Sequence, residues 1–389
     1  MTAIEVRNLT FVGRGGRTLL DDVSLTVPDG STFALCGPPG AGKTALLRVI
    51  VGIDDQTEGD VLFDDVLVNA VGPRERDVAM VFSDFALHPH LDVYDNLSFS
   101  STLRKGVDRD ALDDRVEEVA EFLALTALLD LKPADLDDAQ RQRVAIGRSL
   151  VREAAVYLFD EPFSAQSDHS RALVRSVTTQ WQGEKTRTSV VTTTDVEEAL
   201  ALSDHLAVMH RGVVHQVGSP RELYDRPADL FVAGFLGRPA MNLVAARPTG
   251  SRLVLPFTSI PMDVELERAV GDRDLVIVGI RPEQCLDATS AEAREVCDRV
   301  ELTSRIDEVE WRGRSQLVYF GFELDPEVEG QLEAIEDALD FDLFQSFLAA
   351  ELSAGSPLRA GMSARIVVPR DAIHVFDPET GENLTPRRS

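Results

Sequence analysis

The residues best suited to chemistry lie in one glycine-rich stretch, which separates an apolar segment from a helical pattern. This stretch matches the pattern G-x-x-x-x-G-K-[ST]. Its residues are Gly37, Pro38, Pro39, Gly40, Ala41, Gly42, Lys43 and Thr44. Glycines let successive backbone N–H groups turn toward an anion, and the start of the following helix adds the positive end of its dipole. Lys43 offers a charge to the β- and γ-phosphates, and the Thr44 hydroxyl is suited to bind Mg²⁺. Because the flanking strand and helix argue against a chance glycine-rich turn, we predict a phosphate-binding loop.

Two adjacent acids supply the second half of such a site. Asp160 and Glu161 follow the apolar run 155–159. An acidic pair after a strand is usually only a polar strand end, but this pair shares its chain with the glycine-rich loop. Asp160 would then hold Mg²⁺ through water, and Glu161 would orient or deprotonate the attacking water. We therefore predict Thr44 and Asp160 as metal-binding residues and Glu161 as the catalytic residue.

A sheet and several helices must position these residues. Apolar residues at helical spacing predict helices over 94–130 and after Gln140, and shorter apolar or alternating runs predict strands. The predicted fold is therefore α/β, with the strand, loop and helix order of a P-loop NTPase and a helical subdomain at about 84–154. The predicted strands of this part cover residues 4–9, 23–27, 32–36, 59–63, 77–82 and 155–159.

The last third of the chain follows a different pattern. From about Met241, short apolar strands alternate with turns, which suggests a small β-barrel of the oligonucleotide/oligosaccharide-binding (OB-like) shape. Residues 327–353 interrupt this pattern with apolar residues at helical spacing, which predicts a helical insertion. This insertion is either a helix packed on the barrel or a dedicated regulator site. We divide the chain into a nucleotide-binding domain, 1–237, and a β-barrel domain, 238–389.

Length and composition narrow the class of protein. At 389 residues, of which 44% are hydrophobic, the chain suggests two or three globular domains. The sequence contains no run of about 18 apolar residues that would predict a membrane span, and its first residues do not match a secretory signal peptide. We therefore expect a partner protein to carry any membrane role. Cys36, Cys285 and Cys297 lack a metal-binding spacing, and we expect free thiols in a reducing cytosol.

The charge balance is strongly acidic. Asp and Glu number 66 against 39 Lys and Arg, for a formal net charge of −27. Such a charge repels nucleic acid and anionic lipid, and its self-repulsion destabilises the compact state unless salt screens it. We therefore expect no nucleic-acid partner and a cell with a salty cytoplasm. A GC-rich genome, which favours Arg over Lys, is the alternative, but it does not account for the excess of acids.

Further motifs occur along nearly the whole chain. Together with the glycine-rich loop and the acidic pair, they make the chain similar to a known family, the ATP-binding subunits of ABC importers of the maltose/trehalose/glycerol-phosphate type. The resemblance implies ATP and Mg²⁺ as cofactors, permease subunits and a second ATPase subunit as partners, and the cytoplasmic face of the cell membrane as location. It also implies that the barrel is an accessory TOBE domain for dimerisation and regulation. The motifs are residues 73–76, 78–82, 86–91, 93–94, 140–148, 159–162, 227–228, 231–237, 241–243 and 279–283.

The chain departs from that family at the loop that completes the partner subunit's site. In that family the signature loop has the sequence Leu-Ser-Gly-Gly-Gln. In this chain Asp137, Asp138 and Ala139 occupy its Ser-Gly-Gly positions. Two carboxylates would face the γ-phosphate, and each like-charge contact at about 4 Å costs roughly 1–4 kcal/mol. Acids at a helix N-terminus stabilise that helix by roughly 0.3–1 kcal/mol. We therefore expect Asp137 and Asp138 to be good helix caps and poor phosphate ligands.

Four other positions depart in the same direction. Ser83 stands at the family's glutamine after the Val-Phe strand, and Thr194 stands at its switch histidine. Ser167 replaces the aspartate of the loop that crosses the dimer interface, although Asp168 is one residue away. The adenine-stacking aromatic is absent near residues 12–13, and Phe11 is the nearest candidate. We interpret the chain as a degenerate ATPase domain that binds ATP through Lys43, Thr44 and Asp160 and hydrolyses it slowly at best.

Three functions remain open from the sequence. The first is the ATP-binding subunit of a solute importer, with carbohydrate as the expected solute and with impaired hydrolysis. The second is a non-hydrolysing, nucleotide-sensing or structural subunit that pairs with a regular ATPase paralogue. The third is an importer ATPase for oxyanions or polyamines, which the stretch 241–243 disfavours because it is typical of the sugar branch.

Overall fold

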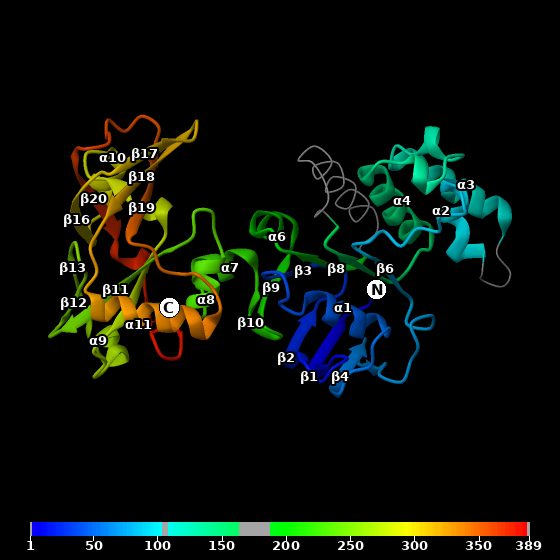
Figure 1. Ribbon diagram of the computed structural model, residues 1–389, viewed down its shortest axis with the longest axis horizontal. Helices are drawn as coiled ribbons and strands as arrows, with labels where there is room; N and C mark the ends of the chain where they lie inside the picture. Colours follow the sequence, from blue (N-terminus) through cyan, green and yellow to red (C-terminus); the bar gives the residue numbers. More distant parts are fainter. Residues whose placement is uncertain (1, 103–107, 163–186, 387–389) are drawn as a thin grey trace. The chain divides into compact units, whose positions relative to one another are not determined.

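The chain forms two compact units, Met1–Leu223 and Tyr224–Ser389. The computed structural model describes residues 2–102, 108–162 and 187–386 (Figure 1). Within these residues, every helix is too short or too polar to span a lipid bilayer. Each unit has its own hydrophobic core, and each is described separately below.

A six-stranded sheet forms the centre of the first unit. Its core strands β3 (Thr32–Cys36), β8 (Thr188–Thr193), β7 (Val156–Asp160) and β6 (Val78–Val81) are parallel neighbours in that order. Strand β9 (His205–His210) runs parallel to β3 on its other side, and β10 (Val213–Gly218) is antiparallel to β9. Continuous apolar runs such as those of β3 and β7 are typical of parallel strands that are covered on both faces. The carboxyl ends of these strands therefore meet at one edge of the sheet.

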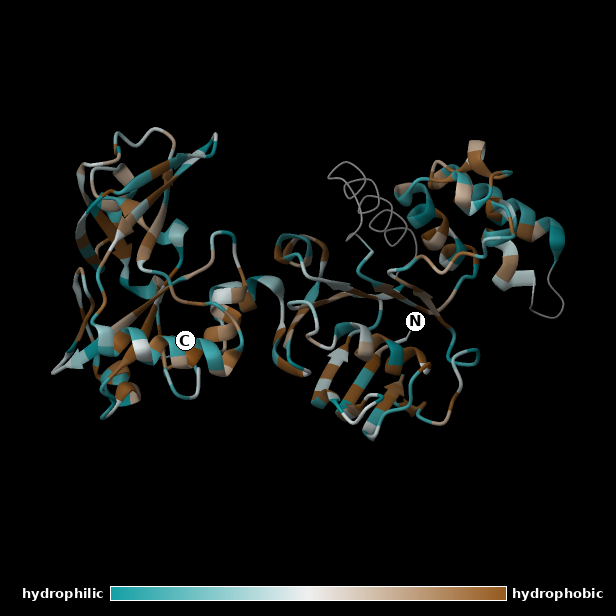
Figure 2. Cartoon of the chain, in the orientation of Figure 1, coloured by the Kyte–Doolittle hydropathy of each residue, from teal (hydrophilic) through white to brown (hydrophobic). Residues whose placement is uncertain are grey.

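A second, antiparallel sheet packs with helix α1 (Lys43–Val51) around a shared core. Its strands alternate between hydrophobic and hydrophilic residues (Figure 2), as expected for a sheet with one buried face. Leu46, Leu47 and Ile50 of α1 are fully buried in the same core as Ile4 and Leu20. The strands, in spatial order, are β2 (Thr18–Val27), β1 (Ile4–Val12), β4 (Glu58–Phe63) and β5 (Val66–Leu67).

Helices α2 (Val93–Thr102), α3 (Arg109–Phe122) and α4 (Asp138–Val151) form the helical part of the first unit. Gly147 allows α4 to approach its neighbours, because a Cβ there would lie 2.6 Å from a methyl carbon of Leu97 and 2.9 Å from one of Leu123. The predicted helical stretch 94–130 is divided: α3 ends at Phe122, and a short 3-10 turn follows at Thr126–Leu128. Helix α6 (Val196–Leu202) comes directly after β8.

The second unit is rich in β-structure, as predicted. Its described strands are all antiparallel and form three sheets around one large apolar core. The first sheet has the order β13 (Ser259–Pro261), β12 (Arg252–Val254), β11 (Asn242–Thr249), β14 (Val276–Ile280) and β21 (Ile373–Phe376). The second has the order β15 (Leu286–Asp287), β20 (Ser363–Pro369) and β16 (Arg299–Arg305). The third has the order β17 (Glu308–Trp311), β18 (Ser315–Gly321) and β19 (Phe347–Ser353).

The helical insertion predicted over 327–353 is only half helical. Helix α11 (Pro326–Leu339) occupies its first part, and Asp340 ends the helix in the left-handed conformation with φ 52°. The prediction was wrong for residues 347–353, which form strand β19. A short apolar run such as 347–350 fits a buried strand as well as a buried helix, so spacing alone cannot distinguish the two. Helices α7 (Pro220–Asp225), α8 (Leu230–Phe235), α9 (Val264–Val270) and α10 (Ala291–Glu295) are all short.

Candidate nucleotide-binding site

The glycine-rich loop joins β3 to α1 and depends on glycine where the backbone is crowded or left-handed. Gly40 and Gly42 have φ values of 78° and 101°, which side chains of L-residues rarely tolerate. A Cβ at Gly37 would lie 2.1 Å from the carbonyl oxygen of Met209, and one at Gly42 would lie 2.8 Å from that of Leu19. Helix α1 begins at Lys43, immediately after Gly42. The loop therefore leads into a helix N-terminus, as a phosphate-binding loop must.

The Lys43 ammonium group lies inside this loop. It donates hydrogen bonds to the carbonyl oxygens of Gly37 and Pro38, at 2.8 and 3.0 Å, and lies 3.5 Å from a carboxylate oxygen of Glu161. Its side chain is only 4% exposed. Burial lowers the pKa of Lys43 below its ordinary value, while the neighbouring Glu161 carboxylate opposes that shift. The arrangement holds a cation within reach of any anion that the loop binds.

Asp160, at the end of β7, receives two hydroxyl hydrogen bonds on the same carboxylate oxygen. Thr44 and Thr192 each donate one to Oδ1 at 2.9 Å. Asp160 is buried, and Thr192 lies beside it in register on the neighbouring strand β8. Hydroxyl and carboxylate oxygens are the ligands that Mg²⁺ prefers. Thr44 and Asp160, which were predicted as a metal pair, are thus in direct contact.

Glu161 follows Asp160 in the left-handed conformation, with φ 44°. Its backbone N–H donates to the Thr192 hydroxyl at 2.8 Å, and its carboxylate lies beside the Lys43 ammonium. The sheet therefore brings together the four predicted residues Lys43, Thr44, Asp160 and Glu161. Sequence reasoning missed Thr192, which holds the two acids in place. Strand β8 reads TSVVTT, so its sequence does not distinguish Thr192 from the other threonines, and the register of Thr192 with Asp160 was not visible in the sequence.

The two acids in the signature position lie at the start of α4, where Asp137 is the N-terminal cap. The Asp137 carboxylate accepts a hydrogen bond from the Gln140 N–H at 2.7 Å, and the Gln140 side chain accepts one from the Asp137 N–H at 2.9 Å. This reciprocal pair is a capping box. Asp138 lies in the first turn and pairs with Arg141 at 2.8 Å, and Ala139 follows it. Asp137 thus caps the helix as predicted, whereas Asp138 is not a cap and lies in the first turn; that both are poor phosphate ligands stays a prediction.

The other divergent positions lie at strand ends or outside the described residues. Ser83 is exposed in the segment that follows β6, and Thr194 directly follows β8. Phe11 is partly buried and packs on the core around α1. Ser167 and Asp168 lie outside the described residues. The prediction that Phe11 stacks on adenine stays a prediction.

Arg148, which sequence reasoning assigned no role, connects α4 to the segment after β6. Its guanidinium donates to the carbonyl oxygens of Ala86 at 2.6 Å and Phe85 at 3.2 Å. Both of these residues have positive φ values, 43° and 62°, so the segment adopts an uncommon conformation that Arg148 holds. Helix α4, which Asp137 caps, is thereby tied to the segment that contains Ser83.

This fold and site define a P-loop nucleoside triphosphatase domain. The family model described as "ABC transporter" matches residues 20–164. Two of the solved structures that match are each 26% identical in sequence. One is an ATP-binding cassette, MJ0796, in a dimeric post-hydrolysis state with ADP and Pi; the match covers 56% of this chain and 99% of that one, with a TM-score of 0.51. The other is cbiO1 from Clostridium perfringens, part of an ABC transporter complex. This match covers 57% of this chain and 89% of that one, with a TM-score of 0.52.

Curated relatives match along the full length. The trehalose import ATP-binding protein SugC of Mycobacterium tuberculosis is 38% identical over 95% of both chains. The xylose/arabinose import ATP-binding protein XacJ of Haloferax volcanii is 35% identical over 100% of this chain and 97% of its own. The trehalose/maltose import ATP-binding protein MalK of Thermococcus litoralis is 38% identical over 95% of this chain and 96% of its own. The chain therefore belongs to the family of ABC import ATP-binding proteins, and the resemblance inferred from its motifs is confirmed.

Proposed function

We propose that this chain is the ATP-binding subunit of a carbohydrate importer. The convergence of Lys43, Thr44, Asp160 and Glu161 at the carboxyl edge of the parallel strands carries the proposal, because it supplies a cation for the phosphates, oxygen ligands for Mg²⁺ and a carboxylate for the attacking water. The substrate class is supported by the relatives, whose names specify trehalose, xylose/arabinose or trehalose/maltose import. Import also requires permease subunits and a second ATPase subunit, and it places the chain at the cytoplasmic face of the membrane.

Each residue of the site has a role that follows from its chemistry. The loop N–H groups and the Lys43 ammonium bind the phosphates, and Thr44 and Asp160 hold Mg²⁺, which neutralises phosphate charge when bound. Glu161 accepts the proton of the attacking water, and its carboxylate lies 3.5 Å from the Lys43 ammonium group. Thr192 fixes the positions of Asp160 and of the Glu161 backbone. Phe11 is the candidate for contact with the adenine.

We further propose that hydrolysis is impaired. In an ABC dimer the signature loop of one subunit completes the site of the other, and here that loop would present Asp137 and Asp138 to the γ-phosphate. Asp137 already uses its carboxylate as the cap of α4, so it offers negative charge and no donor. Ser83 and Thr194 lack the side chains that would sense Mg²⁺ and the γ-phosphate. These features also favour the second candidate, a nucleotide-sensing subunit that pairs with a regular ATPase paralogue.

Calorimetric titration with Mg-ATP in concentrated KCl tests the binding role. We expect Lys43→Ala to weaken binding by at least about tenfold, since it removes the charge inside the loop. Lys132→Ala is the matched control, because it removes an exposed lysine elsewhere in the first unit and should leave the affinity unchanged. Equal affinities of Lys43→Ala and the unmodified protein would overturn the proposed site.

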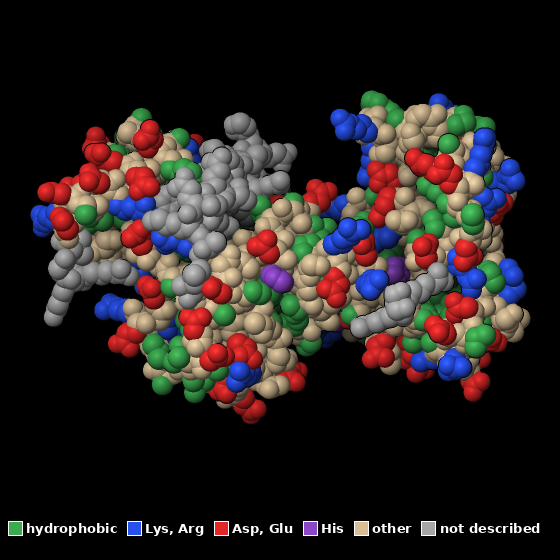
Figure 3. Space-filling model, turned by 180° about the vertical axis from the view of Figure 1, so that it is seen from behind, with side chains coloured by type: hydrophobic (Ala, Val, Ile, Leu, Met, Phe, Trp, Pro, Cys, Tyr) green, Lys and Arg blue, Asp and Glu red, His purple; other side chains and the backbone are tan. Residues whose placement is uncertain are grey.

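The acidic surface supports the interpretation that the protein works at a high salt concentration. Asp and Glu side chains are spread over the visible faces of both units (Figure 3). Two related import proteins come from Haloferax volcanii. We propose that this chain is adapted to high salt, which screens the repulsion among its acids.

A further inference from the structure

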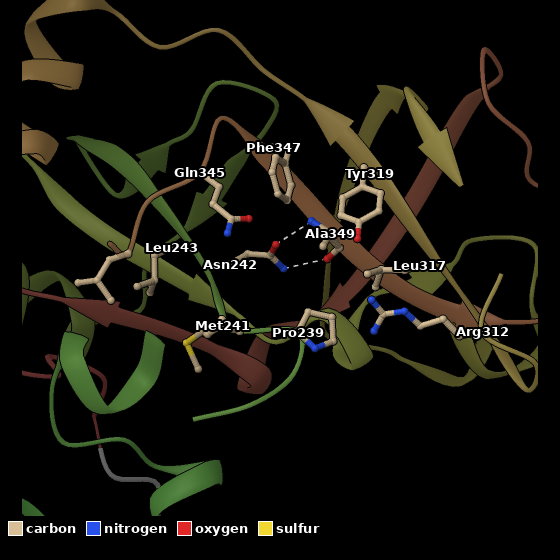
Figure 4. A pocket seen from close by; sticks show the side chains of 12 residues that line it. Pro239, Met241, Asn242, Leu243, Arg312, Leu317, Tyr319, Gln345, Phe347 and Ala349 are labelled. Carbon is tan, nitrogen blue, oxygen red and sulfur yellow. Dashed lines mark hydrogen bonds between the residues drawn. The ribbon is translucent and has the colours of Figure 1, made fainter. Parts of the chain in front are cut away.

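A pocket of about 230 Å³ opens on one face of the β17–β18–β19 sheet in the second unit. All of its lining residues belong to that unit. Its polar members are Asn242, Arg312, Tyr319 and Gln345, and its other members are apolar or aromatic. Figure 4 shows Phe347 and Tyr319 next to each other, with Asn242 beneath them and with Arg312 and Leu243 toward opposite ends of the pocket. None of these residues belongs to the nucleotide site.

Two aromatic rings and a small residue beside them line the pocket. Alternate residues of a strand point to the same face, so Leu317 and Tyr319 of β18 share a face with Phe347 and Ala349 of β19. In register, Ala349 lies opposite Tyr319. The rings of Tyr319 and Phe347 meet edge to face, with centroids 5.2 Å apart. The single methyl group of Ala349 leaves the space beside these rings open.

Asn242 makes the floor of the pocket rigid. Its amide nitrogen donates to the carbonyl oxygens of Ala349 and Ile280, both at 2.9 Å, and its carbonyl oxygen accepts from the Ala349 N–H at 2.7 Å. Asn242 is buried and its polar atoms are used in these bonds. It therefore positions Ala349 and leaves ligand binding to the groups around the rim.

The rim combines hydrogen-bond donors and acceptors with little net charge. Arg312 donates to Glu310 at 3.0 Å, and the Tyr319 hydroxyl donates to the same carboxylate oxygen at 3.3 Å. Gln345 is exposed, and its amide can both donate and accept. Glu351 lies on the same strand face as Ala349, two residues further along β19.

We propose that this pocket binds a neutral, polyhydroxylated molecule of the size of one monosaccharide. The choice of a sugar rests on the proposed function, because an importer of carbohydrate delivers such molecules to the side where this subunit lies. The aromatic rings of Tyr319 and Phe347 offer flat apolar faces to the C–H face of a sugar ring, and Gln345 and Arg312, which line the pocket, can hydrogen-bond its hydroxyls. The pocket is smaller than the roughly 300–1,000 Å³ of sites for drug-sized ligands, which suits a single ring.

The charges around the pocket argue against an anionic ligand. The guanidinium of Arg312 is already neutralised by Glu310, and Glu351 adds a further negative charge nearby. A sugar phosphate or inorganic phosphate would therefore meet more acids than bases. A quaternary ammonium compound would suit the rings and the acids, but it would leave the Gln345 amide without a use.

Calorimetric titration of the full chain in concentrated KCl with D-glucose, D-xylose, choline and inorganic phosphate tests this proposal. We expect saturable binding of at least one sugar with a dissociation constant of roughly 1 mM or lower, and none of choline or phosphate. Ala349→Leu fills the pocket floor and should abolish sugar binding. Gln345→Ala, an exposed change with no predicted effect on folding, should weaken it several-fold. Trp311→Ala is the matched control: this residue is exposed on the same hairpin without lining the pocket, and its removal should change nothing.

The proposal is overturned if neither sugar binds, if choline or phosphate binds instead, or if both Ala349→Leu and Gln345→Ala bind sugar like the unmodified protein. Mg-ATP binding measured on the same samples separates this proposal from the proposed function. Loss of the sugar signal with Lys43-dependent ATP binding intact contradicts only the pocket proposal. ATP binding that does not depend on Lys43 contradicts the nucleotide site itself.

Discussion

The Thr192 hydroxyl donates a hydrogen bond of 2.9 Å to the Asp160 carboxylate and accepts one of 2.8 Å from the Glu161 N–H. One side chain on β8 thus positions both acids at the end of β7. Thr192 is fully buried, so water cannot replace either bond. The metal-binding and catalytic acids consequently depend on a residue that, in this account, touches neither nucleotide nor metal.

We predict that Thr192→Val raises the Mg²⁺ concentration needed for nucleotide binding several-fold. It removes one of the two hydroxyls on Asp160 and leaves a backbone N–H without its partner, which costs about 1–3 kcal/mol of stability. Magnesium titrations at fixed ATP, with urea unfolding alongside, measure both effects.

Thr193→Val is the control for this change. Thr193 bonds to Glu198 at 3.1 Å and accepts the Asp195 N–H at 2.9 Å, so its loss affects stability on the same strand without touching Asp160. An equal rise in the magnesium requirement of both variants would show that Thr192 acts only through stability.

We predict that Asp137→Ala lowers the free energy of unfolding by about 1 kcal/mol, because it removes the side-chain half of the capping box of α4. Asp137→Ser keeps a capping oxygen and should cost much less. Urea unfolding of the two variants checks this. Equal stabilities would mean that the cap contributes nothing.

We predict that His374 makes the protein less stable as the pH falls from 6.5 toward 4. Burial, with a smaller effect of Arg281, lowers the pKa of His374 from 6.5 to about 4 in the folded protein. Between these values the unfolded chain binds a proton that the folded chain does not, so protonation favours unfolding. His374→Gln should lose less stability over this interval. Urea midpoints at several pH values test it, and parallel curves for the two proteins would contradict it.

We predict that KCl stabilises the protein strongly between 0.1 M and 1 M. The screening length falls from about 10 Å to about 3 Å over that range, which weakens the repulsion within a net charge of −27. Thermal unfolding at a series of KCl concentrations measures the effect. A melting temperature independent of KCl would favour the explanation that a GC-rich genome alone shaped the composition.

The parts of the site that follow one another in the chain were predictable. The strand, glycine-rich loop and helix around Lys43 are coded by local spacing, and Asp160 and Glu161 end an apolar strand. Thr192 was not predictable, because its role depends on the register between β7 and β8, which are separated by about thirty residues of chain. The same limit applies to Arg148, whose carbonyl partners lie more than sixty residues away.

The second unit shows where periodicity fails. A β-rich domain was predicted from short strands and turns, and its three antiparallel sheets confirm this. The helical prediction failed over 347–353, because Leu348 and Ala350 face the apolar core of the unit while Phe347 and Ala349 face the pocket. Because both faces of this strand carry apolar residues over 347–350, its sequence has no alternation there that would distinguish it from a helix.

Steady-state Mg-ATP hydrolysis in molar KCl tests the central claim most directly, namely that the site binds ATP but is limited by the acids of the signature loop. We predict a turnover well below about 1 s⁻¹ for the unmodified chain. The triple change Asp137→Ser, Asp138→Gly and Ala139→Gly should raise it by at least about tenfold, and adding Glu161→Gln should abolish the gain. A Lys43-dependent turnover of about 1 s⁻¹ or more in the unmodified chain, with no gain from the triple change, would contradict the account.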